Sequence, residues 1–172
     1  MLSSSVGFKE GGSILKTVLT LLFISLFIVL LLVACPDPYQ KVNVDGSAFI
    51  YGDHFNEKTT LTLKGNYNKK EYSFQGSLTI GDNIKLEHVL FASGYSLISY
   101  VRAERTSVGQ VFFDPKSLRV SFEVTDPEIY KLITYQEYDG KSKLVVSSPA
   151  VNRDEAQRVN EELEQMKAPF DK

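Results

Sequence analysis

From Lys41 to Ser148 the sequence alternates between apolar and polar residues, and turn-forming residues recur every eight to twelve positions. A side-chain period of two is typical of β-strands that are buried on one face. Many short strands separated by turns favour one antiparallel domain, either a β-sandwich or a partly open barrel, for which we expect about seven to nine strands. In the clearest strand, one face should be buried, formed by Leu118, Val120, Phe122 and Val124.

The end of the chain changes from the strand period to a helical one. Asn152 is a good N-cap residue, and Glu155 follows at the spacing of a capping box. We expect a helix over about 153–167 that packs a narrow apolar stripe against the sheet. The stripe consists of Ala156, Val159, Leu163 and Met166.

The segment between the last two predicted strands carries mixed signals. Asp126 followed by Pro127 indicates a helix start. Residues 132–138 are rich in β-branched and aromatic side chains, so we expect one helical turn, then a strand, then a tight turn at residues 139–140. Three tyrosines gather here and are candidate interaction residues, because tyrosine is frequent at recognition surfaces, although it also favours strands. They are Tyr130, Tyr135 and Tyr138.

A single uncharged apolar run, Thr17–Ala34, precedes this domain, and 15 of its 18 residues are apolar. As a helix it would be about 27 Å long. That length lies just inside the range of a membrane-spanning helix and slightly above that of a signal-peptide core. We therefore interpret residues 1–34 as a signal peptide or a membrane-anchor helix.

The run ends in Leu32-Val33-Ala34-Cys35, followed by Pro36. This ending resembles the lipobox of bacterial lipoproteins. The resemblance implies cleavage before Cys35 and attachment of lipid to its thiol, so that acyl chains replace the helix as the anchor. The alternative is a retained membrane helix in which Cys35 is a small apolar residue.

Both interpretations predict a protein of the cell membrane, held in the lipid bilayer through the N-terminal helix or a lipidated Cys35. Lys9 and Lys16 precede the apolar run and favour a cytoplasmic N-terminus. Residues 35–40 would then form a short proline-containing tether. Residues 41–172 would form a β-rich domain on the extracytoplasmic face.

Composition excludes several functions for the domain. Beyond residue 34 it holds 17 basic and 20 acidic residues without a basic stripe, which argues against binding to nucleic acid. A single cysteine excludes a disulfide scaffold.

His54 shares a loop with Asp53 and Glu57 but matches no metal-binding spacing. His88 alternates with leucines, and we expect it on the core side of its strand.

The sequence contains neither a glycine-rich phosphate loop nor a GxSxG motif, and we predict no catalytic, cofactor-binding or metal-binding residues. The run Val145–Ala150, which leads into the final helix, resembles in style the small membrane-anchored β-rich proteins of unknown function from Gram-positive bacteria. We expect a binding module without catalytic activity whose partner is an envelope protein or peptide. The alternative is a cell-surface hydrolase.

Two structural features would separate these alternatives. A hydrolase should show a polar pocket lined by groups with shifted pKa values. A binding module should show an exposed apolar or aromatic patch, or an open sheet edge suited to strand addition.

Overall fold

The computed structural model describes residues 11–33, 37–101 and 104–166; the side chains of 11–15, 29–33, 100, 101 and 104 are not described. The chain divides into two compact units, Met1–Asp37 and Pro38–Lys172. The first unit contains helix α1 (Gly11–Val33). Within the described part of the chain, no helix is both long enough and apolar enough to cross a membrane.

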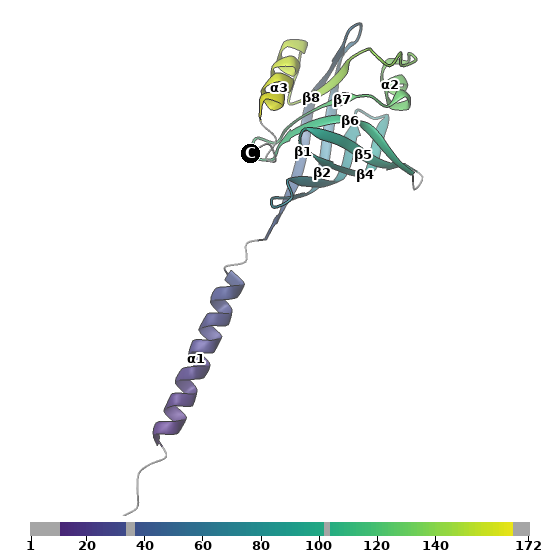
Figure 1. The fold of residues 1–172 in the computed structure, drawn as a ribbon. Coiled ribbons are helices and arrows are strands. Elements are labelled where there is room, and N and C mark those ends of the chain that lie inside the picture. Colours follow the sequence, from purple (N-terminus) through teal and green to yellow (C-terminus); the bar gives the residue numbers. More distant parts are fainter. Residues whose placement is uncertain (1–10, 34–36, 102–103, 167–172) are drawn as a thin grey trace, which may run out of the picture. The chain divides into compact units, whose positions relative to one another are not determined.

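The second unit is a closed antiparallel barrel in which eight strands follow one another in chain order (Figure 1). The barrel closes where β1 pairs with β8, with Phe49 opposite Ser147 and Gly52 opposite Leu144. The prediction of a mainly β domain with a C-terminal helix is confirmed, and the sheet closes into a barrel. The strands are β1 (Tyr39–Gly52), β2 (Asn56–Asn68), β3 (Ser73–Ile80), β4 (Ile84–Ala92), β5 (Tyr95–Val101), β6 (Glu104–Asp114), β7 (Arg119–Val124) and β8 (Leu144–Ser148).

Side chains fill the interior of the barrel, as expected for an eight-stranded barrel of this size. Phe74 is fully buried and stacks on Phe91, with ring centroids 4.9 Å apart. Phe113 meets both rings edge to face, at 6.2 and 5.9 Å. Phe122 is also fully buried. The alternation seen in the sequence therefore supplies the core.

Two positions of the segment 118–124 differ from the prediction. Leu118 lies in the turn between β6 and β7 with a left-handed backbone (φ 56°) and is 36% exposed, whereas Val120, Phe122 and Val124 are buried. Ser121, on the opposite face of β7, is buried as well. A helix covers that part of the outer surface, which the strand pattern alone does not reveal.

The prediction that His88 faces the core is wrong. Gly76 on β3 pairs with Val89, and Leu78 pairs with Leu86, so two residues of β4 lie opposite the single residue Ser77. This β-bulge shifts the alternation of β4. Val89 is buried in place of His88, which is exposed.

Residues 132–138 do not form the predicted strand. Helix α2 (Pro127–Thr134) continues through the first three of these residues, and the chain between α2 and β8 contains no strand in the described structure. The Asp126 side chain accepts a hydrogen bond from the Ile129 amide at 2.9 Å, which caps the helix. Ile129 and Ile133 join the barrel core. Burial of these two isoleucines across one end of the barrel stabilises a helix here in preference to a strand.

Helix α3 (Arg153–Gln165) begins where the sequence predicts, with the Asn152 side chain accepting from the Glu155 amide at 2.9 Å. Residue 167, its predicted end, lies outside the described residues. The helix packs on the outer surface beside β1, β7 and β8 (Figure 1). Its buried apolar residues are Ala156, Val159 and Leu163, whereas Met166 is 48% exposed.

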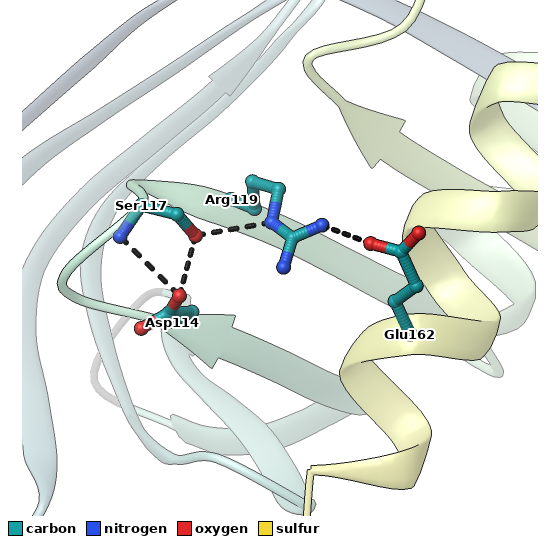
Figure 2. A network of polar contacts seen from close by, with 4 residues as sticks. All are labelled: Asp114, Ser117, Arg119 and Glu162. Carbon is teal, nitrogen blue, oxygen red and sulfur yellow. Dashed lines mark hydrogen bonds and ion pairs between the residues drawn. The ribbon is translucent and has the colours of Figure 1, made fainter.

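Polar contacts hold α3 in register on the barrel. Beneath the helix, the Ser121 hydroxyl donates to the Asn160 side-chain oxygen at 2.6 Å and lies 2.9 Å from the Ser147 hydroxyl. At the surface, Arg119 forms an ion pair with Glu162 and donates through Nε to the Ser117 hydroxyl at 3.0 Å (Figure 2). The Ser121–Asn160 and Arg119–Glu162 contacts join α3 directly to β7, and the contacts with Ser147 and Ser117 extend them to β8 and to the turn before β7.

Asp114 completes this surface network, because Ser117 donates to it through both its hydroxyl and its amide (Figure 2). Burial alone would raise the pKa of Asp114, but these hydrogen bonds and one from the Lys116 amide outweigh it and lower that pKa. These hydrogen bonds therefore hold the conformation of the turn between β6 and β7.

Candidate functional site

A pocket of about 580 Å³ lies at the end of the barrel that α2 covers. It is bounded by α2, by the first residues of β2 and by the turn between β3 and β4; we call it the α2 cleft. Its buried aliphatic lining consists of Ile50, Ile80, Ile84 and Ile133. Its exposed polar lining includes Glu57, Lys58, Asp82 and Asn83.

The wall formed by α2 exposes two large apolar side chains. Leu132 is 53% exposed and Tyr135 is 80% exposed, and both line the cleft. Tyr135 follows the last helical residue and adopts a left-handed backbone, φ 59° and ψ 21°, with its amide donating to the Lys131 carbonyl at 2.9 Å. This conformation is uncommon for a bulky residue. The end of the helix thus holds an aromatic ring in solvent beside an aliphatic pocket.

The backbone that presents Tyr135 is fixed from both sides. The Thr134 hydroxyl donates to the Tyr130 carbonyl at 2.9 Å and accepts from the Gln136 amide at 3.2 Å. Lys131 forms an ion pair with Glu137 across the turn. Local hydrogen bonds therefore fix the backbone from which the exposed ring projects.

The three candidate tyrosines fall into two groups. Tyr130 is buried and Tyr138 is half-buried, and their rings pack together with centroids 4.9 Å apart. Both rings pack with the barrel core. Tyr135 alone of the three lines the cleft. The structure thus gives Tyr130 and Tyr138 a packing role and leaves Tyr135 accessible to a partner.

The groups with shifted pKa values lie away from the cleft. Burial, followed by the carboxylates of Glu164 and Glu161, raises the pKa of Tyr51 to about 12. Burial raises the pKa of Tyr67, and hydrogen bonds from the Ser142 and Lys141 amides lower that of Asp139. None of the shifted residues, Asp114 included, lines the cleft. What the cleft itself offers is apolar contact and hydrogen bonding.

A second, smaller groove of about 330 Å³ lies between α3 and β1. Tyr51 forms part of it, with the Arg153 guanidinium 5.9 Å from the ring centroid. Its remaining side chains are mostly charged and exposed to solvent. It lacks the exposed aromatic and aliphatic residues that distinguish the α2 cleft.

Among the described residues, no group of three or more histidine, cysteine, aspartate or glutamate side chains could hold a metal ion. Asp53, His54 and Glu57 accordingly form no such group. Cys35, the predicted lipidation site, lies outside the described residues.

Sequence reasoning missed Lys58 and Leu132 as site residues. The sequence predicts a strand within residues 132–138, which include Leu132. Both residues reach the cleft because α2 folds over the barrel end, which no local pattern encodes. Tyr135 was found because tyrosine is enriched at recognition surfaces.

Comparison with protein-family models, with curated proteins and with solved structures found no match to this chain.

Proposed function

We propose that the barrel domain is a non-catalytic binding module whose ligand occupies the α2 cleft. The observation that carries this proposal is the exposed pair Leu132 and Tyr135 beside an aliphatic pocket. The cleft volume of about 580 Å³ is typical of ligand pockets, which occupy roughly 300–1,000 Å³.

Exposure of this pair supports binding because transferring apolar side chains out of water lowers the free energy. Burying about 100 Å² of their surface would contribute about 2.5 kcal/mol to association. The polar rim of Glu57, Lys58 and Asp82 would provide hydrogen bonds that orient the ligand.

We propose further that residues 1–35 hold the domain at the cell membrane, with the domain on the extracytoplasmic face. Support for this attachment comes from the sequence: the uncharged run Thr17–Ala34, the lysines that precede it, and the lipobox-like residues 32–35. A tethered binding module would meet its partner in the cell envelope.

Site-specific photo-crosslinking tests the cleft as the binding site. With p-benzoylphenylalanine in place of Tyr135 in the full chain, irradiation of living cells should yield a discrete crosslinked species. The matched control carries the same group at Leu118, which is also exposed but lies in the turn between β6 and β7 at the opposite end of the barrel. Mass spectrometry would identify what is captured.

Binding at the cleft predicts that the added substitution Leu132→Asp removes the crosslink at position 135, since a carboxylate opposes apolar contact. Leu132 is 53% exposed, so stability should change by less than about 1 kcal/mol. Equal capture from positions 135 and 118, or capture that survives Leu132→Asp, would refute the proposed site.

Labelling with a radioactive or clickable palmitate tests the anchor. If Cys35 is lipidated, the wild-type chain should carry the label and Cys35→Ala should not. Fractionation of the same cells then distinguishes the two anchors, because a retained helix keeps Cys35→Ala in the membrane at its full length. Recovery of unlabelled wild-type chain outside the membrane fraction would contradict both forms of attachment.

A further inference from the structure

Beside the α2 cleft, the first residues of β2 have a strand partner on one side only. Strand β2 pairs with β1 along its whole length, beginning with Asn56 opposite Tyr51. Its pairing with β3 begins only at Leu61, opposite Ile80. The last backbone hydrogen bond toward β3 runs from the Gly81 amide to the Thr60 carbonyl, at 2.9 Å. Residues 56–60 therefore have a strand partner on one side.

The direction of the free backbone groups follows from strand geometry. The amide and carbonyl of one residue point to the same side of an antiparallel strand, and those of the next residue point to the other side. The Thr60 carbonyl points away from β1, and the register from residue 56 to 60 contains no bulge. The amide and carbonyl of Lys58 therefore point away from β1 too, as do those of Asn56. Within the described structure no strand pairs with them on that side.

This open edge faces a helix across the cleft. Lys58 and Thr60 line one wall of the α2 cleft, and Leu132 and Tyr135 line the other. A slot between the open edge of a strand and a helix matches an extended peptide, whose backbone can continue the sheet while alternate side chains enter the pocket.

We propose that the α2 cleft binds an extended segment of a partner protein, which adds to the open edge of β2 as a further strand. This inference rests on the proposed function and specifies its ligand. Peptide residues on either side of the one opposite Lys58 direct their side chains toward the aliphatic lining formed by Ile80, Ile84 and Ile133. Apolar residues are favoured at these positions.

The charge of Lys58 indicates which type of peptide residue is favoured between these two apolar positions. Lys58 is exposed, and its ammonium group makes no ion pair with any described residue. A peptide residue directly opposite Lys58 places its side chain on the same face, where an acidic group is favoured. The partner segment is therefore apolar–acidic–apolar at its centre.

A second copy of this chain fits the edge less well. In each copy the edge of β2 lies in a slot beside its own α2, and the exposed Leu132 and Tyr135 stand at that slot. A single extended segment can enter the slot, whereas an incoming barrel would carry its own α2 against the first. We therefore assign the site to a separate extended segment.

Selection from a random peptide library displayed on phage, with the full chain in detergent micelles as the target, tests the proposal. Selected peptides should share the apolar–acidic–apolar centre and should compete with one another for one site. Their affinity is then measured by fluorescence anisotropy with synthetic labelled copies, and the oligomeric state of the complex by light scattering.

Backbone pairing is tested separately from side-chain contact. Lys58→Pro removes the amide that faces the cleft, at a position where an edge strand tolerates proline, and should weaken binding about tenfold or more. Lys58→Ala keeps that amide and should weaken binding only about two- to threefold. N-methylation of the peptide at alternate residues gives the same test without altering the protein: methylation should abolish binding only where the amide faces β2.

The outcomes separate this inference from the function on which it rests. Binding that is lost in Leu132→Asp but unaffected by Lys58→Pro and by N-methylation would overturn strand addition while supporting the cleft as a binding site. Failure to select any peptide would overturn the peptide inference, and the Tyr135 crosslink would then decide the proposed function. A complex that forms only as a dimer of this chain would assign the edge to a second copy and overturn the separate partner.

Discussion

Replacing Phe122 with alanine is expected to lower the free energy of unfolding by about 3–5 kcal/mol. Phe122 is fully buried in β7, and its neighbours on that face, Val120 and Val124, are buried as well. The backbone beside it is held on both sides, opposite Val111 of β6 and Val146 of β8. A closed barrel cannot collapse into the space left by the ring without breaking one of these ladders, so most of the cavity should persist.

Urea denaturation of the full chain in detergent, followed by circular dichroism, measures this loss. The matched control is Tyr135→Ala, which also removes an aromatic ring, but from a residue that is 80% exposed. That control should change the free energy of unfolding by less than about 0.5 kcal/mol. An equal loss in the two variants would mean that Phe122 does not fill the barrel.

A second large effect is expected at Gly109, where alanine should destabilise the domain by more than about 3 kcal/mol or prevent its folding. A Cβ atom at this position would lie 1.7 Å from the Glu123 carbonyl oxygen of the neighbouring strand. Because that oxygen belongs to the backbone, relief requires β6 and β7 to separate. The adjacent Val108 carbonyl accepts from the amides of Thr125 and Asp126, at 2.9 and 3.1 Å, immediately before α2.

Gly109→Ala should therefore disturb the start of α2, and with it the cleft, in addition to the barrel. The same denaturation experiment measures the loss, and the control is Gly46→Ala. A Cβ atom at Gly46 meets nothing within 4 Å, so alanine should be neutral or stabilise the domain by up to about 1 kcal/mol. Comparable stability of the two variants would show that β6 and β7 are not in close contact at Gly109.

Both predictions also concern the candidate site, because the barrel core supports the helix that forms one wall of the cleft. Phe122 supports β7, and the chain leaves β7 directly into α2, whose residues Ile129 and Ile133 close the barrel end. The position of Leu132 and Tyr135 therefore depends on the core beneath them. A variant that loosens the core should weaken binding at the cleft, even though no core residue needs to touch the ligand.

Side-chain periodicity predicted much of this fold because the burial of alternate residues is a local property of a strand. The segment from Val120 to Val124 and the helix capped by Asn152 lie where the patterns place them. The strand predicted at 132–138 failed because burial of Ile129 and Ile133 outweighs the preference of β-branched residues for strands. Local propensity is a small term beside the burial of two isoleucines.

His88 and Ser121 show a second limit of the pattern. The bulge in β4 moved His88 to the outside, and α3 buried Ser121 on the outer face of β7. Both outcomes depend on a partner strand or helix that is distant in the sequence. For the same reason the sequence did not predict the open edge at Lys58. This edge exists because β3 ends at Ile80, opposite Leu61, whereas β2 begins at Asn56.

By itself the sequence determined a mainly β domain followed by a capped C-terminal helix, because alternation, turns and caps act over a few residues. Only the tertiary structure decided that the sheet closes into a barrel and that α2 covers its end. Tertiary structure also decided that residues 56–60 of β2, in the cleft that Tyr135 also lines, pair with β1 on one side and with no described strand on the other. These features arise from contacts between strands and helices far apart in the chain, where register and burial outweigh local preference.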